Sequence, residues 1–267
     1  MISFIHRGGE NMASYRYRCA IPAKELGASI NDLSADVVIF AKPMDGDAES
    51  ARLIQKLGSK VIVDFCDDHL DWPHYRAMLD LADAVTCPTE KMAERLRWDV
   101  TVIPDSYEFD EVEPHCNGNN VLWFGNAVNW GSLARVLPEL NGYPLRVVSN
   151  VQGAIPWSMN TMLYEFDRAD IVILPSTKDY KSPNRALEAI RQGCFVVAEP
   201  HPSINDFPGI WIGSIKEGIE WANQNQLEAR NQTTLAQNYI REKYSARTLA
   251  NAWRKVVESV STSEAAA

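Results

Sequence analysis

The chain has 267 residues, enough for one large domain or two small ones. Apolar residues make up 46% and charged residues 23%, which are ordinary globular values and exclude the disordered and fibrous classes. The formal net charge of −9 argues against a general nucleic-acid coat or a polybasic membrane binder, which need a dominant basic surface. It leaves room for a local basic cleft.

No membrane span, secretion signal or cysteine framework is recognisable. No apolar run approaches the roughly 18 residues of a span, and residues 1–7 become charged too early for a secretory signal. We therefore expect a cytoplasmic protein. The five cysteines are widely spaced without a Cys-x-x-Cys pair, and the histidines form no His-x-x-x-His. This pattern predicts reduced thiols, most of them in the core, and no zinc site.

The first half of the chain alternates short apolar runs with helical segments. The runs typical of buried strands are Ile2–His6, Val37–Phe40, Val61–Phe65, Ala84–Cys87 and Val100–Ile103. The helical segments are Tyr15–Leu26, Ala48–Leu57, Tyr75–Ala82 and Glu90–Arg97, the last with Thr89 as N-cap. Strands without polar alternation, separated by helices, favour a parallel sheet covered on both faces. We predict a Rossmann-like domain over residues 1–105.

An acidic linker over residues 106–120 precedes a second series of the same kind. Its predicted strands are Val121–Phe124, Leu145–Val148, Ile171–Leu174, Phe195–Val197 and Ile210–Ile212. Its predicted helices are Ser132–Leu140, Thr161–Arg168 and Ser182–Gln192. We expect a second domain over residues 121–213, then helices and a tail over 214–267, with 261–267 frayed.

The predicted fold class is therefore α/β, with two small doubly wound domains facing across a cleft. The ligand site is expected in that cleft, at the carboxyl ends of the strands.

One helix start carries most of the chemistry. After the strand Ile171–Leu174, Ser182 suits the N-cap and Pro183 the first helical position. The free amides and the helix dipole make an anion site, and Glu188 follows about one turn later. The surrounding cations are Lys178, Lys181 and Arg185. The pattern fits a nucleoside diphosphate, with phosphates on the amides and ribose hydroxyls on the glutamate. A well-capped surface helix with solvated charges explains the same spacing.

This segment resembles the donor-binding segment of GT-B-fold retaining glycosyltransferases, the glycosyltransferase group 1 superfamily. The resembling residues are Lys181–Arg185, Glu188–Ala189, Gly193 and Val196–Ala198, and in matching order Val102–Asp105, Leu122–Gly125, Ile155–Trp157, Leu163 and Ala169–Ile171. The similarity covers most of residues 100–200 and is mainly architectural over residues 1–99.

The resemblance implies roles for particular residues. Glu188 would hold the ribose, and the diphosphate would be held by Ser182, Asn184 and Arg185 with their amides. Residues 149–157 would lie near the base, where Trp157 either stacks on it or serves packing.

Two departures from the family pattern affect this assignment. Tyr180 stands eight residues before Glu188, where the family often has an acidic residue, and Asn126–Trp130 replaces an Arg and Lys pair. The phosphate cations must then come from Lys178, Lys181, Arg185 or the first domain. The chain is also short for the family, so acceptor-binding insertions are expected to be missing.

The first domain offers candidate groups where its strands end. Gly8 and Gly9 would let backbone amides approach a phosphate, unless they only form a tight turn. Asp68 and His69 are the best candidates to orient an acceptor hydroxyl or take its proton, with helix capping as the alternative.

Two further motifs have simpler explanations beside the functional ones. Tyr15, Arg16 and Arg18 form a patch that would bind phosphate or clamp a nucleic-acid strand on the acceptor side, or begin an amphipathic helix with snorkelling arginines. Asp45-Gly46-Asp47 has the Asp-x-Asp form of metal-dependent GT-A transferases, but we interpret it as a turn. We predict no metal and no cofactor.

The predicted function is transfer of a hexose from a nucleotide-diphosphate sugar, expected to be a UDP-sugar, to an acceptor hydroxyl. Lys181 and Arg185 would stabilise the departing diphosphate, and retention of configuration is implied by the resemblance. The acceptor would be a glycan or lipid-linked sugar. The alternatives are hydroxymethylated bases in DNA, a sugar-nucleotide epimerase and a non-catalytic sugar-nucleotide-binding protein.

Overall fold

The computed structural model describes residues 1–262, which form two compact units. Unit 1 comprises residues 1–108, 180–182 and, within the described part, 243–262, and unit 2 comprises residues 109–179 and 183–242. The C-terminal helix therefore belongs with the first unit. Of the expected frayed tail, Ser261 and Thr262 are helical, and residues 263–267 lie outside the described part.

Unit 1 is built on a six-stranded sheet in which every neighbouring pair is parallel. The order is β2 (Ser29–Ile30), β1 (Ile2–Ile5), β3 (Val37–Ala41), β4 (Lys60–Asp64), β5 (Ala84–Cys87), β6 (Val100–Val102). The predicted parallel sheet is confirmed. The two-residue strand β2 is absent from the prediction because so short a run carries no periodicity.

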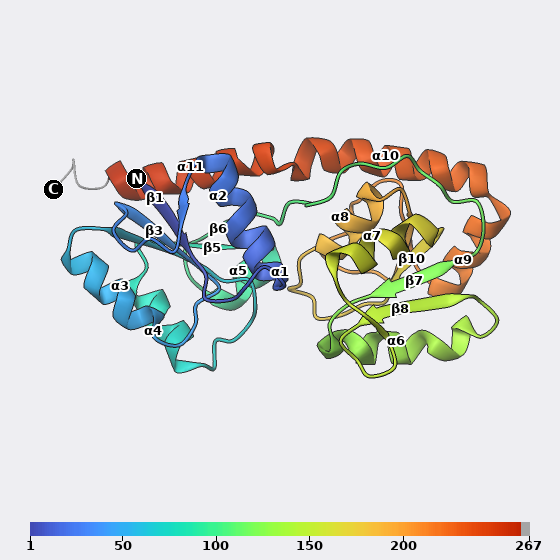
Figure 1. Ribbon diagram of the computed structural model, residues 1–267, viewed down its shortest axis with the longest axis horizontal. Helices are drawn as coiled ribbons and strands as arrows, with labels where there is room; N and C mark the ends of the chain where they lie inside the picture. Colours follow the sequence, from blue (N-terminus) through green and yellow to red (C-terminus); the bar gives the residue numbers. More distant parts are fainter. Residues whose placement is uncertain (263–267) are drawn as a thin grey trace. The chain divides into compact units, whose positions relative to one another are not determined.

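Helices cover both faces of this sheet (Figure 1). On one face, Val38, Phe40 and Val63 pack with α3 (Asp47–Lys56) and α4 (Pro73–Leu81). On the other face, Ile39 and Ile62 pack with Trp253 of α11 (Ala246–Thr262). The alternation follows from the two-residue period of a strand, so a continuous apolar run feeds two cores. The helix α5 (Glu90–Leu96) is capped by Thr89, as predicted.

The first helical segment is interrupted where the sequence predicts a single helix. Residues 13–26 form α1 (Ala13–Tyr15), a π-helical turn η1 (Arg16–Ala20) and α2 (Ile21–Leu26). Pro22 has no N–H to donate to the preceding turn, and the helix widens just before it, where the Ile21 amide bonds to the Arg16 carbonyl.

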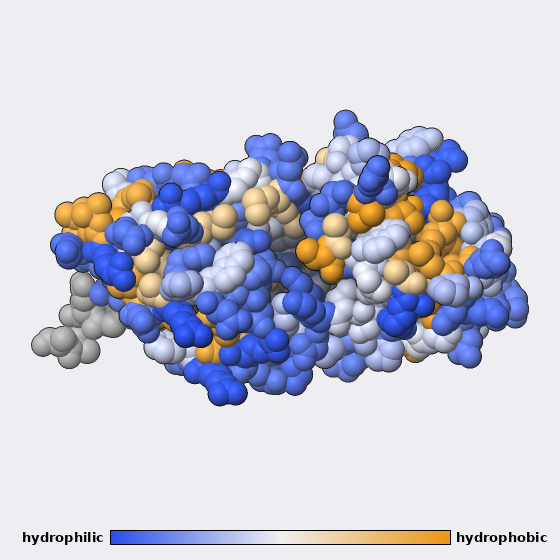
Figure 2. Space-filling view, turned by 90° about the horizontal axis from the view of Figure 1, so that it is seen from below, coloured by the Kyte–Doolittle hydropathy of each residue, from blue (hydrophilic) through white to orange (hydrophobic). Residues whose placement is uncertain are grey.

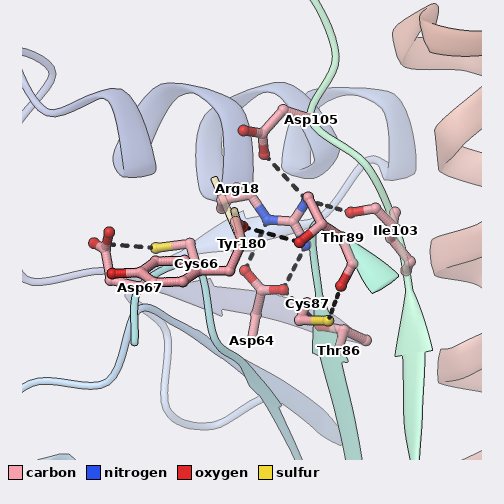
Figure 3. A network of polar contacts seen from close by, with 10 residues as sticks. All are labelled: Arg18, Asp64, Cys66, Asp67, Thr86, Cys87, Thr89, Ile103, Asp105 and Tyr180. Carbon is pink, nitrogen blue, oxygen red and sulfur yellow. Dashed lines mark hydrogen bonds and ion pairs between the residues drawn. The ribbon is translucent and has the colours of Figure 1, made fainter. Parts of the chain in front are cut away.

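This wide turn directs Arg18 into the interior of unit 1 (Figure 3). Arg18 is 1% exposed, and its Nε and Nη2 donate to both carboxylate oxygens of Asp64 at 2.9 and 2.5 Å. Nη1 donates to the carbonyl of Ile103 and, at 3.2 Å, to Asp105. Burial acts to lower the pKa of Arg18, but Asp64 outweighs it and the pKa is raised. A side chain so enclosed contacts no acceptor, so the acceptor-side role predicted for Arg18 is wrong.

Unit 2 repeats the plan with a second all-parallel sheet. Its order is β12 (Trp211–Ile212), β11 (Phe195–Ala198), β10 (Ile171–Leu174), β7 (Val121–Phe124), β8 (Leu145–Ser149), β9 (Ile155–Pro156). The remaining helices are α6 (Trp130–Val136), α7 (Met159–Arg168), α8 (Asn184–Arg191), α9 (Ile215–Gln224) and α10 (Gln226–Tyr244), with short 3-10 turns η2 (Ala127–Asn129) and η3 (Leu137–Leu140). Its core includes Trp123, Ile173 and Phe195.

Polar residues cover most of the face seen in Figure 2, with smaller apolar patches on both units. Within residues 1–262, none of the helices combines the length and hydropathy needed to span a bilayer.

We expect Arg18→Met to destabilise unit 1 by about 3–5 kcal/mol, because Asp64 and Asp105 are then buried without their cation. Urea unfolding followed by circular dichroism measures this loss. Arg52→Met is the matched control, since Arg52 lies in an exposed pair 3.9 Å from Glu49 and exposed pairs contribute little. Equal midpoints for the two variants would contradict a central role for Arg18.

Candidate functional site

The strand order of each sheet marks where a ligand crevice is expected. In unit 2 the chain runs from β7 outward to β8 and β9, and then returns to β10 on the other side of β7. In parallel α/β sheets, ligands bind at such a reversal, beside the carboxyl ends of the two strands. The loops that leave β7 and β10 carry Gly125 and the segment leading to α8.

The helix α8 begins without a side-chain cap. Its first residue is Asn184 and its N-cap is Pro183, and no side chain caps its amides. The prediction of Ser182 as N-cap is wrong, because the helix begins one residue later, and the enclosed Ser182 hydroxyl has no hydrogen-bond partner among the described residues. An uncapped helix start keeps its amides and the positive end of its dipole available to an anion.

Arg185 lies in the first turn of α8 and has no carboxylate within ion-pair distance among residues 1–262. Its Nη1 makes one long hydrogen bond, 3.4 Å, to the carbonyl of Phe124 at the end of β7. Burial lowers its pKa to about 10, so it stays charged at neutral pH. Arg185 is half-buried, and charges withdrawn from water are normally paired. No carboxylate within residues 1–262 supplies that partner, so the guanidinium can pair with an anion from outside these residues.

Gly125 gives this guanidinium its space. A Cβ at Gly125 would lie 3.1 and 3.2 Å from the indole of Trp123 and 3.5 Å from Nη1 of Arg185. Any larger residue would therefore press on the fully buried Trp123 or on Arg185. The glycine that follows the first strand of unit 2 is required by this close packing.

Two side chains beyond β11 fix the loop between β10 and α8. The carboxylate of Glu199 accepts the Ser176 amide at 2.7 Å and is paired with Arg135. The Nε2 of His201 lies 2.9 Å from the carbonyl of Lys178, and a carbonyl only accepts, so Nε2 carries the hydrogen. Burial lowers the pKa of His201, and Arg185 lowers it further. His201 is thus a neutral donor that shapes the loop.

The other predicted donor residues of unit 2 have different exposures. Glu188 is 2% exposed on the buried face of α8, while Asn184 and Trp157 are half-buried and Lys178 is exposed. The ribose and base contacts that the resemblance implies for Glu188 and Trp157 stay predictions.

In unit 1, the two glycines after β1 differ in their surroundings. The amide of Gly8 donates to Nδ1 of His6 at 2.9 Å, and a Cβ at Gly8 would lie 2.1 Å from the sulfur of Met12. The Gly8 amide is therefore engaged by His6, and its predicted role in phosphate binding stays a prediction. A Cβ at Gly9 would meet no described atom within 4 Å, and the Gly9 carbonyl accepts the Met12 amide.

Lys181 is engaged within unit 1. Its Nζ lies 2.6 Å from Oδ1 of Asp67, whose Oδ2 is 2.8 Å from Nζ of Lys42. Burial acts to raise the pKa of Asp67, but Lys181 and Lys42 outweigh it and the pKa is lowered. The preceding Tyr180 is 4% exposed, its carbonyl accepts the Thr89 hydroxyl at 2.9 Å, and Arg95 lies over its ring (Figure 3 shows Tyr180 beside Thr89). Lys181 is therefore held by Asp67 and not by the start of α8.

The two candidates for the acceptor hydroxyl differ in their surroundings. Asp68 is paired with Arg95 of α5 at 2.7 Å, a structural role at a neighbouring helix. His69 stacks on Trp72, with ring centroids 4.0 Å apart and planes 4° apart. Burial lowers the pKa of His69, so its ring is neutral at pH 7.

The predicted arginine and tyrosine patch does not form an open basic surface. Arg16 donates to both oxygens of Glu108 at 3.1 and 2.8 Å, Arg18 is buried, and Tyr15 packs edge-on against His6. This removes the feature that favoured DNA as acceptor.

The Asp45-Gly46-Asp47 motif is a turn, as predicted. Gly46 has φ 84°, and Asp47 is 2% exposed, with its carboxylate bonded to Arg7 and to the Met44 amide. Throughout the described chain, histidine, cysteine and acidic side chains form no group of three or more that could ligate a metal ion. The absence of a metal and a cofactor from the reaction stays a prediction.

Comparison with known proteins places this geometry in a fold family. No protein-family model matches the sequence, and no curated protein matches it in sequence. HepE from Anabaena, solved in complex with UDP-glucose, superposes with a TM-score of 0.71 and 10% identity over 97% of this chain and 99% of its own. The fold is GT-B.

Two other solved structures support the same assignment. A putative UDP-N-acetylglucosamine 2-epimerase from Listeria monocytogenes has a TM-score of 0.56 and 10% identity, covering 97% of this chain and 95% of its own. An alpha1,3-fucosyltransferase has a TM-score of 0.54 and 8% identity, covering 87% of this chain and 80% of its own. The predicted fold is confirmed. Identities this low show the fold alone.

Several residues near these strand ends escape prediction from the sequence. Nothing in the sequence distinguishes Asp67 from the other acidic residues of the segment Asp64–His69. Lys42 and His201 belong to no recognisable motif. Only the pairing of parallel strands brings Lys42 beside Asp67, since β3 and β4 are neighbours. The signal that identifies Lys42 and Asp67 is a charged residue just after a buried strand.

We expect the free energy of unfolding to fall between pH 7 and pH 5. The pKa values of His6, His69 and His201 are lowered by burial, so in this window these imidazoles bind more protons in the unfolded chain than in the folded one. Asp105, whose pKa is raised by burial, acts in the opposite direction. The pKa values of Asp67 and Glu199 are lowered, so these carboxylates change the free energy of unfolding only below about pH 4.5. Urea unfolding at each pH measures the slope, and His201→Gln should reduce it. An unchanged slope in that variant would show that His201 is not neutral in the folded chain.

Proposed function

We propose that the chain is a glycosyltransferase that binds a nucleoside-diphosphate sugar, expected to be a UDP-sugar, on unit 2. The observation that carries the proposal is Arg185, a cation without a carboxylate partner among the described residues, at the uncapped start of α8. A diphosphate supplies the missing anion, and both the amides and the guanidinium donate to its oxygens. The position at the reversal of strand order between β7 and β10 supports it.

In this proposal the chemistry depends on charge at the leaving group. When the bond between the sugar and the diphosphate breaks, negative charge grows on the phosphate oxygens. The fixed amides of α8 and Arg185 stabilise that charge without reorganising, which lowers the barrier. Lys181, predicted for the same role, is held by Asp67 at 2.6 Å, so Arg185 is the principal side-chain cation. Glu188 holds the ribose hydroxyls.

The acceptor is proposed from residue chemistry. We propose a glycan or lipid-linked sugar as acceptor, hexosyl transfer with retention, and no metal requirement. The burial of Arg18 and the pairing of Arg16 with Glu108 remove the basic patch that favoured DNA. The name of one fold neighbour is that of a putative epimerase, and product analysis separates the two activities. An epimerase would convert a UDP-sugar to its epimer without any acceptor. A glycosyltransferase would yield a new product only when a glycan acceptor is added.

Arg185→Ala should weaken the binding of UDP and UDP-sugars about tenfold or more, since a charge-assisted hydrogen bond contributes roughly 1.5–3 kcal/mol. Isothermal titration calorimetry measures the dissociation constant, after a thermal-shift screen of nucleotide sugars has found the donor. Arg168→Ala is the control, because Arg168 is exposed at the end of α7, before β10. Unchanged donor affinity in Arg185→Ala would count against the assignment.

Glu188→Ala should weaken the binding of donors that carry ribose and leave the binding of inorganic pyrophosphate unchanged, because pyrophosphate has no ribose for Glu188 to hold.

A further inference from the structure

An exposed aromatic stack follows β4 in unit 1. Trp72 is 46% exposed, and the ring of His69 covers one of its faces at 4.0 Å. The buried Tyr75 lies 5.9 Å from Trp72 and 5.5 Å from His69, nearly perpendicular to both. His74 lies 5.3 Å from Trp72 with its ring tilted by 50°. Tyr75 and His74 therefore flank the stack at an angle, and neither ring lies parallel on its outer face.

The loop that carries the stack is fixed by its own hydrogen bonds. The His69 amide donates to the Asp67 carbonyl at 3.1 Å, and the Trp72 amide donates to the His69 carbonyl at 2.9 Å. Pro73 then limits the backbone at the start of α4. The two rings are therefore held before any ligand arrives, which lowers the entropy cost of binding.

Neither helix capping nor core packing explains the tryptophan. Trp72 is the N-cap of α4 but makes no side-chain cap hydrogen bond, at a position where Ser, Thr, Asp or Asn stabilise a helix. Nearly half of its surface is exposed, so it also contributes little to the core.

The position of the stack points to the site of unit 1. The loop follows the carboxyl end of β4, next to β3, and the chain reverses between β1 and β3 in this sheet. His69 lies close enough to Asp67 and Lys42 to interact electrostatically with both. The stack therefore borders the crevice that strand order predicts for this unit.

We propose that Trp72 and His69 form a stacking platform for a pyranose ring of a neutral acceptor glycan, an inference that rests on the proposed function. The C–H bonds on one face of a pyranose carry partial positive charge and pack on the negative face of an aromatic ring. The adjacent Asp71 has a fully exposed carboxylate 3.9 Å from the guanidinium of Arg76, which is also exposed. This pair offers both acceptors and donors to sugar hydroxyls and carries no net charge, which suits a neutral sugar.

The test measures glycan binding to the full chain without donor. A set of neutral trisaccharides of glucose, galactose, mannose or N-acetylglucosamine serves as the probe in saturation-transfer NMR. We expect one of them to receive saturation at the C–H protons of one ring face, and Trp72→Ala to weaken it about tenfold, as for stacked ligands on aromatic platforms. Trp72→Phe, which keeps an aromatic face, should restore much of the binding.

Trp98→Ala is the matched control. Trp98 is 50% exposed in the same unit but lies between α5 and β6, at the opposite edge of the sheet. Thermal unfolding checks that the variants fold. If Trp72→Ala does not fold, His69→Ala tests the platform in its place.

Three outcomes would overturn the platform. No trisaccharide binds, or Trp72→Ala and Trp98→Ala weaken glycan binding equally, or Trp72→Ala weakens the binding of UDP and not that of the glycan. UDP titrations of the same samples report the donor site, so loss of the platform and failure of the proposed function are distinguishable.

Discussion

The guanidinium of Arg18 is the interaction on which unit 1 depends. It joins the π turn η1, the last residue of β4 and the segment after β6 through Asp64, Ile103 and Asp105, and it lies 5.4 Å from the ring centroid of Trp253 in α11 (Figure 3 shows the polar contacts). Two buried carboxylates and one buried cation are each costly alone. Together they hold four elements at the carboxyl edge of the sheet, where the candidate groups lie.

The same region of unit 1 holds two of the residues that precede α8. Thr89 holds the carbonyl of Tyr180, and Asp67 holds Lys181. The third, Ser182, has an enclosed hydroxyl without a hydrogen-bond partner among the described residues. The helix α8 starts at Asn184, one residue later than its capping pattern predicts, and its N-cap Pro183 makes no side-chain hydrogen bond. Uncapped amides are what an anionic ligand requires.

How far the sequence predicts the structure depends on whether a feature is local. Apolar runs and helical spacing predict both sheets, and Thr89 is recognisable as a cap because its partner Met92 is three residues away. The role of Arg18 is not predictable, because its partners Asp64 and Asp105 stand far along the chain. The same holds for Lys181 and Asp67. In each case the sequence pattern predicts that a cation binds an outside ligand, but in the fold a carboxylate far along the chain is paired with that cation. Arg185 lies at the start of α8 as predicted, no described carboxylate neutralises it, and its binding of an anion stays a prediction.

Charge balance gives the two units different recognition chemistry. In unit 1, the cations near the reversal of strand order are internally neutralised: Lys42 and Lys181 share Asp67, Arg7 is paired with Asp47, and Arg95 is paired with Asp68. What that edge exposes is the aromatic stack of His69 and Trp72. In unit 2, the corresponding edge keeps a guanidinium at Arg185 that no described carboxylate neutralises. One surface is suited to an anion and the other to an uncharged, ring-shaped ligand. The proposed donor carries a charged diphosphate and the proposed acceptor is uncharged, so this division of charge matches the proposed pair of substrates.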